Sequence, residues 1–160
     1  MTALKICIYP DPILYKKAEQ VPCVDDSICV LIKDMAETMH SSKGIGLAAN
    51  QVGIPKRIII VMDNQNLVEI INPEIERTTG EETAEEGCIS LPGEAWKIKR
   101  AKKITVHGIN VRGRKIKIKA EGLLARIIQH EIDHLNGILI KDRASFGQTQ
   151  PCVKSYENKL

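Results

Sequence analysis

The pentapeptide His130-Glu131-Ile132-Asp133-His134 constrains the fold of this chain more than any other part of its sequence. It lies in a stretch starting at Gly122 in which apolar residues recur at spacings of three and four, a period that predicts a helix ending at Gly137. The apolar residues cover a wide arc of that helix, so we expect it to be buried. Histidines four residues apart share one helix face, where both imidazoles can reach one cation while Glu131 points toward its open side.

The alternative for this motif is a pair of core histidines that hydrogen-bond to backbone carbonyls. It would leave Glu131 buried without a partner, which is costly for a carboxylate. We therefore favour a metal site.

The third ligand decides the class of metal site. Ile140 stands where the metzincin pattern needs a ligand, and Glu157 is the glutamate that remains downstream for a gluzincin pattern. Upstream, Cys88 lies among turn-forming glycines and a proline in the stretch 85–93. Its thiolate would give a Cys-His-His set with one position left for water. The alternative for Cys88 is an inert core cysteine, and the neighbouring histidine motif favours the ligand.

The rest of the chain predicts an α+β fold with an antiparallel sheet wrapped on the central metal-binding helix. An amphipathic period predicts a first helix over 26–42. We interpret the glycine-rich stretch 44–53 as a loop whose backbone closely approaches another group. Runs of β-branched residues or strict alternation predict strands. These strands are 56–62, 68–72, 104–106, 109–111 and 115–119. The turn residues 63–66 predict a hairpin between the first two, and Pro73 should close the second.

Composition narrows the class of protein. With 160 residues we expect one catalytic domain over 1–147 and a C-terminal tail over 148–160. The longest strongly apolar run, 58–62, cannot span a membrane, and the N-terminus does not resemble a secretory signal, so we expect a cytoplasmic protein. Five irregularly spaced cysteines without C-x-x-C argue against a disulfide framework. A net charge of +3 with 3% aromatic residues does not favour nucleic-acid binding.

Three stretches, in this order and spacing, resemble the motifs of the peptide deformylases. They are 44–51 (GIGLAANQ), 86–90 (EGCIS) and 129–135 (QHEIDHL). The resemblance implies a peptide-deformylase-like fold and removal of the formyl group from the N-terminal formyl-methionine of nascent polypeptides. It also implies one divalent metal ion held by Cys88, His130 and His134, usually Fe²⁺ and often replaced by Zn²⁺ or Ni²⁺.

The implied mechanism is consistent with the residue types. A bound cation lowers the pKa of water from 15.7 to about 7, so that hydroxide can attack the formyl carbon at neutral pH. Glu131 would accept the proton of that water and pass it to the departing amine. The resemblance assigns stabilisation of the developing oxyanion to the side chain of Gln51 and the backbone N–H of Ile89.

Substrate binding follows from the same resemblance. An extended peptide would pair with two segments by strand addition. The residues given this role are Gly44, Ile45, Gly46, Leu47 and Gly87. The methionine side chain would enter an apolar pocket near Ile45, Leu123 and Ile127, with the stem of Arg126 as a wall. The alternative for the three apolar residues is an ordinary place in the core.

Supporting residues and departures from the family pattern complete the prediction. Glu86 and Arg100 match an ion pair that supports the metal-bearing strand, which matters only where it is sheltered from water. Asn50 stands where proline or threonine is frequent, Ile89 replaces leucine, and the stretch 93–96 has no arginine to meet the far end of a peptide.

Contact with the ribosome is a further possibility for this chain. A basic cluster could face ribosomal RNA, although a solvated strand edge is the favoured interpretation. The cluster consists of Lys97, Lys99, Arg100, Lys102 and Lys103. The short tail shows no strong amphipathic helix of the kind that some family members dock on the ribosome.

Two other functions remain open. A zinc endopeptidase could carry the same helix motif, although its downstream third ligand is missing. A non-catalytic module with a structural or sensory metal would need a fourth ligand, and the spare histidines are His40 and His107.

Overall fold

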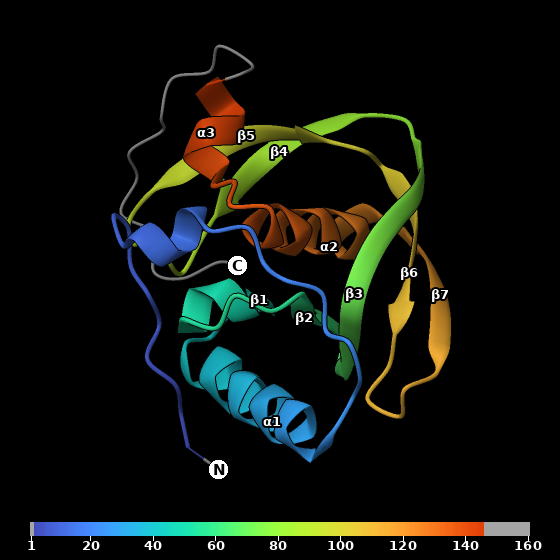
Figure 1. Ribbon diagram of the computed structural model, residues 1–160. Helices are drawn as coiled ribbons and strands as arrows, with labels where there is room; N and C mark the ends of the chain where they lie inside the picture. The colour runs from blue at the N-terminus through green and yellow to red at the C-terminus, as the bar shows by residue number, and fades with distance from the viewer. Residues whose placement is uncertain (1, 146–160) are drawn as a thin grey trace.

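The computed structural model describes residues 2–145, so the predicted tail 148–160 and the boundary at residue 147 lie outside the described residues. Five antiparallel strands form one sheet in the order β1-β2-β3-β6-β7, and β4 pairs with β5 in a separate hairpin. Helix α2 lies between this sheet and the hairpin, with α1 on the other side of β1 and β2 (Figure 1). The elements are η1 (Pro12–Tyr15), α1 (Asp26–Ser41), β1 (Gly46–Ala48), η2 (Ala49–Val52), β2 (Ile58–Asp63), β3 (Asn66–Thr79), β4 (Glu82–Gly87), β5 (Ala95–Arg100), β6 (Lys103–Ile109), β7 (Lys115–Glu121), α2 (Gly122–Leu135) and α3 (Ile140–Ser145).

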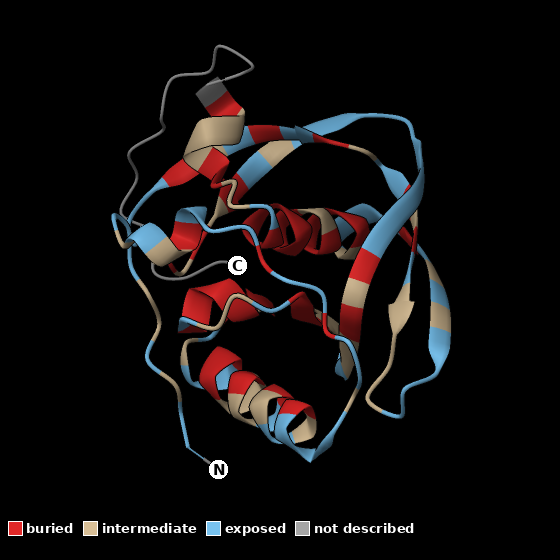
Figure 2. Cartoon of the chain, viewed as in Figure 1, coloured by how far each residue is buried: buried red, intermediate tan, exposed pale blue. Residues whose placement is uncertain are grey.

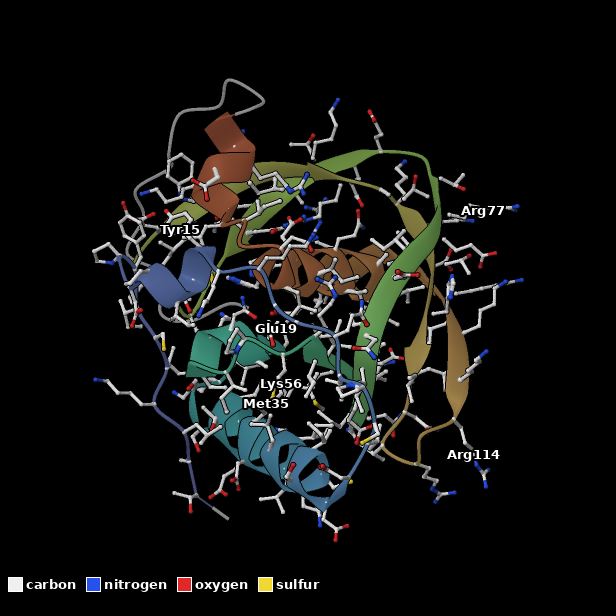
Figure 3. All side chains as sticks on the ribbon, viewed as in Figure 1. Tyr15, Glu19, Met35, Lys56, Arg77 and Arg114 are labelled. Carbon is white, nitrogen blue, oxygen red and sulfur yellow. The ribbon has the colours of Figure 1, made fainter. Side chains whose placement is uncertain are left out.

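Helix α1 forms where its period predicted it. The Asp25 side chain caps it by accepting a 3.0 Å hydrogen bond from the backbone N–H of Ile28. Its apolar face, with Met35 fully buried, packs on Leu47 and on strand β2 in one core cluster (Figure 3). The helix therefore covers the face of the sheet that points away from α2.

The hairpin β2–β3 confirms the predicted turn. Asp63 pairs with Asn66, and Asn64 adopts a φ of 56° between them. The prediction that Pro73 closes the second strand is wrong, because β3 continues to Thr79. A register shift between Ile71 and Glu74 takes Pro73 out of the regular ladder, where its missing N–H costs no pairing.

The predicted strand 109–111 is also different from the structure. β6 runs without interruption to Ile109, and the chain then turns through Asn110 and Gly113 into β7. The Asn110 side chain accepts hydrogen bonds from the backbone N–H groups of Arg112 and Arg114, so its turn chemistry decides the local structure.

Helix α2 is the buried centre of the fold (Figure 2). Its apolar side packs on the five-stranded sheet through residues that include Ala125, Ile128 and Leu135, each with no exposed surface. Gly137 has a φ of 72°, and a Cβ at this position would lie 2.7 Å from the carbonyl carbon of Tyr15. Glycine is therefore required here both by the left-handed conformation and by close approach of η1.

Several elements were not predicted. The stretch 44–53, expected to be a loop, contains the short strand β1 and the 3-10 helix η2, and the hairpin β4–β5 and helix α3 had no clear pattern in the sequence. The cysteines Cys7, Cys23, Cys29 and Cys88 are free, as their spacing indicated. Within residues 2–145, no helix is long and apolar enough to cross a membrane.

Candidate metal centre

Three buried side chains bring one sulfur and two ring nitrogens together. Cys88 Sγ lies 3.3 Å from His134 Nε2, which lies 3.2 Å from His130 Nε2, and all three ligand atoms fall within 4.8 Å of one another. Tetrahedral coordination with ordinary metal–nitrogen and metal–sulfur bonds places ligand atoms roughly 3.3–3.6 Å apart. The two distances from His134 Nε2 are close to this spacing, so the three atoms can surround a single cation.

The fold explains why these residues meet. His130 and His134 lie one turn apart on α2, as the motif predicted. Cys88 directly follows the last residue of β4, so the hairpin carries the thiolate to the helix. Within the described residues no other group of histidine, cysteine, aspartate and glutamate has metal-binding geometry. His40 and His107 lie on the exposed surface, which leaves three protein ligands rather than the four of a closed structural site.

Glu86 orients the first histidine. Its Oε2 lies 2.9 Å from His130 Nδ1, which leaves Nε2 of that ring facing the other two ligands. Arg100 donates two hydrogen bonds to the same carboxylate, at 2.7 and 2.9 Å, and Arg126 donates a third at 2.8 Å. Burial opposes ionisation of Glu86, but the bonds from Arg100 and His130 outweigh it and hold the pKa of this carboxyl well below its usual range.

The predicted pair of Glu86 and Arg100 is sheltered, since their side chains are 0% and 2% exposed. Arg100 also donates to Asp133 at 2.6 Å, and Asp133 accepts hydrogen bonds from Arg143 of α3. Arg100 thus belongs to the interior and not to a basic surface cluster. The neighbouring Lys99 is exposed and pairs with Glu81, as expected for a solvated strand edge.

The surroundings shift the pKa values of the two histidines in opposite directions. Burial lowers the pKa of His130, but hydrogen bonds to Cys88 and Glu86 outweigh burial and raise its pKa well above the usual value. Burial and the charge on His130 lower the pKa of His134 well below its usual value. Metal ligation requires neutral imidazoles, so a cation bound at this centre would displace a proton from His130.

Glu131 stands beside the ligands without a full set of partners. Its Oε2 is buried and has no hydrogen-bond partner, and burial raises the pKa of this carboxyl to about 7. Gly46 of β1 lies against it, because a Cβ at that position would collide with the Glu131 carboxylate and lie 2.7 Å from Ile127 Cγ2. Glycine at this position of β1 therefore lets the strand run past the carboxylate.

Gln51 reaches the centre from η2. Its Oε1 accepts a 2.9 Å bond from the backbone N–H of Ala48, and its Nε2 lies 3.2 Å from Ser90 Oγ and 3.6 Å from Cys88 Sγ. The amide group is thus held at one end and points toward the metal centre at the other. Ser90 was not predicted as a site residue, although its place in the second motif was a signal for it.

An N-terminal segment ties together the two loops that flank the centre. The backbone N–H of Cys7 donates to the carbonyl of Gln51 at 2.7 Å, and that of Tyr9 donates to Ser90 at 2.9 Å. Asn50, which departs from the family pattern, donates its amide to the carbonyl of His134 at 3.0 Å. These bonds fix η2 against both the hairpin and the end of α2.

A pocket of about 490 Å³ opens beside Cys88. It is lined by Lys43, Ile45, Glu85, Gly87, Cys88, Ile89, Leu91, Pro92, Gly93, Glu94, Ala95, Leu123 and Arg126. Leu123 is 61% exposed, so it belongs to the mouth of the pocket and not to the core. Ile127 is 2% exposed and packs in the core between α2 and the sheet. Of the predicted wall, Ile45, Leu123 and Arg126 therefore face the pocket, while Ile127 lies behind it.

Comparison with known proteins finds one family that is similar over most of the chain. The polypeptide deformylase family profile matches residues 3–150. Peptide deformylases of Halothermothrix orenii and Thermodesulfovibrio yellowstonii are 50% and 49% identical, over 89% and 99% of this chain and 94% and 99% of theirs. The crystal structure of peptide deformylase from Thermotoga maritima matches with a TM-score of 0.87 at 42% identity, covering 89% of this chain and 98% of that one. The enzyme from Synechococcus elongatus, crystallised with actinonin, gives 0.87 at 41% identity over 90% and 80% of the two chains.

Proposed function

The chain belongs to the peptide deformylase family, enzymes that remove formyl groups from nascent peptides, and we propose which of its residues carry out the reaction and on which substrate. The proposed reaction is hydrolysis of the formyl amide of N-formylmethionyl peptides at the centre formed by Cys88, His130 and His134. The observation that carries it is the convergence of these three ligand atoms within 4.8 Å beside the unpartnered carboxylate oxygen of Glu131.

Cys88, His130 and His134 would hold one divalent cation. When bound, the cation lowers the pKa of water from 15.7 to about 7 and polarises a carbonyl oxygen. We propose Fe²⁺ as the ion in the cell, with Zn²⁺ or Ni²⁺ able to take its place, since a thiolate with two imidazoles suits all three. Elemental analysis of protein purified without oxygen tests the identity of the ion.

Glu131 moves the proton. A general base works best when its pKa is near the working pH, and the raised pKa of about 7 satisfies this condition. Its unpartnered Oε2 is free to accept a proton from the attacking water. The same carboxyl group then passes the proton to the amine that leaves, so one side chain serves as base and afterwards as acid.

Gln51 and Ile89 would stabilise the negative charge that grows on the formyl oxygen. The bond from Ala48 holds the Gln51 side chain with its amide N–H groups directed toward the centre. Ile89 follows Cys88 directly and lines the pocket, which supports this role for its backbone N–H. Loss of one such donor costs about 3 to 4 kcal/mol of barrier in comparable enzymes.

The peptide would bind between two free strand edges. β1 is an edge strand of the five-stranded sheet and β4 is paired with β5, so within residues 2–145 each strand keeps one edge unpaired beside the pocket. An extended peptide can hydrogen-bond to both, which makes binding tolerant of sequence. The backbone contacts would come from Gly44, Ile45, Gly46, Leu47 and Gly87. The methionine side chain would enter the pocket between Ile45, Leu123 and the stem of Arg126, with Ile127 behind them.

We propose a single catalytic domain that extends to about residue 147 and works in the cytoplasm close to ribosomes, where formylated chains emerge. The deciding experiment compares formyl-Met-Ala-Ser with its acetylated and free-amine analogues and measures formate and amine release. We expect turnover of the formylated peptide alone. Equal turnover of all three would contradict the proposal and favour the zinc endopeptidase.

A further inference from the structure

The proposed metal ligands come from two parts of the fold. His130 and His134 belong to α2, whereas Cys88 follows the hairpin β4–β5, which shares no strand pairing with the five-stranded sheet. Backbone ladders therefore do not set the distance between the thiolate and the imidazoles. Side chains that cross from the helix to the hairpin therefore help to set it, together with the N-terminal segment that binds Ser90.

Arg126 connects helix α2 to the hairpin through the hydrogen bonds of its guanidinium group. It lies one turn before His130 and is 6% exposed. It donates to the carbonyl of Glu82 in β4 at 2.7 Å, to the carbonyl of Ile98 in β5 at 2.9 Å, and to Glu86 Oε1 at 2.8 Å. A single side chain of the helix thus binds the backbone of both hairpin strands and the carboxylate that orients His130.

We propose that Arg126 is a positioning residue that holds the cysteine-bearing hairpin against the histidine-bearing helix at the separation that metal coordination needs. Metal–ligand distances tolerate errors of only about 0.2 Å. A planar guanidinium with donors in a fixed fork can define such a separation, whereas a flexible ammonium cannot. The stem of the same residue lines the pocket, so one side chain serves both the substrate site and the metal site.

The role is not explained by neutralisation of Glu86 alone. Arg100 already binds that carboxylate with two hydrogen bonds, at 2.7 and 2.9 Å. What Arg126 adds is the pair of bonds to the carbonyls of Glu82 and Ile98, which a single positive charge would not replace. The arrangement therefore predicts that the shape of the side chain matters as well as its charge.

The test measures retention of metal and not catalysis. Arg126→Met keeps most of the stem and removes the donors, and Arg126→Lys keeps a charge but loses the fork. Arg57→Met is the matched control, because Arg57 is 8% exposed and donates to Leu135 and Asn136 at the end of α2, away from the hairpin. Each protein is loaded with Ni²⁺ and mixed with excess chelator, and the rate of Ni²⁺ loss is compared with urea denaturation of the same sample.

We expect Ni²⁺ loss to be about 10- to 100-fold faster in both Arg126 variants, as for other residues that support metal ligands. Arg57→Met should retain Ni²⁺ within about 3-fold of the original protein even where its stability falls by a similar amount. The KM for formyl-Met-Ala-Ser should change less in Arg126→Met than kcat, because most of the stem remains.

Three results would overturn the inference. They are unchanged Ni²⁺ retention in the Arg126 variants, full retention by Arg126→Lys, and equally fast loss from Arg57→Met. The inference rests on the metal site proposed above, and the original protein separates the two claims. If it fails to retain Ni²⁺, the proposed function fails as well, whereas retention by every protein removes only the role of Arg126.

Discussion

Replacement of Glu131 with glutamine should inactivate the enzyme and at the same time stabilise its metal-free form. Glutamine cannot accept the proton of the attacking water, so we expect deformylation to slow by about 10²- to 10⁴-fold. The side chain keeps its size, and the metal ligands on either side of it are unchanged. The gain in stability follows from the burial of the carboxylate.

The size of this gain can be worked from the pKa of Glu131. Burial raises it from 4.5 to about 7, so the folded state favours the neutral carboxyl. Below about pH 4.5 the group is protonated in both the folded and the unfolded chain, and its burial has no ionisation cost. The cost grows as the pH rises from 4.5 to 7 and is complete above that, when it reaches about 3 kcal/mol. Glutamine is neutral throughout, so the metal-free variant should gain about 3 kcal/mol near pH 8 and almost nothing near pH 4.

Urea denaturation of chelator-treated protein at both pH values measures the gain, and formate release from the metal-loaded enzyme measures activity. Glu74→Gln is the matched control, because it removes the same charge from an exposed position on β3 and should change stability little. Retained deformylation with the metal still bound would refute the role of Glu131. A stability difference that did not grow with pH would refute the argument from burial.

Three other substitutions test separate parts of the site. Gln51→Ala should lower kcat by about 10²- to 10³-fold with little change in KM, and a rise in KM alone would show that this residue only binds substrate. Glu86→Gln leaves the buried charge of Arg126 without a carboxylate and that of Arg100 with Asp133 alone, so urea denaturation should show a loss of about 3 to 5 kcal/mol together with weaker Ni²⁺ binding; unchanged stability would contradict the buried pair. Gly46→Ala should destabilise the protein by about 1 to 3 kcal/mol, because the new methyl group would meet the Glu131 carboxylate and Ile127. Gly44→Ala is its control, since the nearest atoms to a Cβ there are 3.5 Å away, and equal losses in both variants would contradict the steric argument.

Patterns within short stretches of sequence were sufficient to predict two helices and one turn. Helices α1 and α2 follow from apolar periodicity, and the turn of β2–β3 follows from Asn64 and its neighbours. The hairpin β4–β5 could not be predicted in the same way. Its first strand, Glu82–Gly87, is exposed at half of its residues and contains three glutamates, so its strand structure comes from pairing with β5 and not from a buried apolar face. The prediction at Pro73 was wrong because a register shift between Ile71 and Glu74, which depends on the pairing of β3 with β6, lets β3 continue past the proline.

The residues of the candidate site also differ in how far the sequence could predict them. The spacing of His130 and His134 on one helix face was sufficient to predict a metal-binding pair. Cys88 lies 46 positions before His134, so no helical period connects them, and the resemblance to a family was needed to join them. Arg126 could be predicted only as a wall of the pocket, because the sequence does not reveal that the carbonyls of both hairpin strands converge on its guanidinium.

The buried charges of α2 are retained for the geometry of the centre and contribute little to the stability of the fold. A buried ion pair gains about as much from attraction as it loses from desolvation, and apolar residues of similar size often stabilise a protein better. The helix separates the two tasks by face: Ala125, Ile128 and Leu135 pack on the five-stranded sheet, while Arg126 and His130 face the hairpin. Because the apolar face supplies the free energy of folding, the other face can hold groups whose positions serve the metal. The same separation explains why substitutions on the hairpin side should disturb metal retention more than their effect on stability alone would predict.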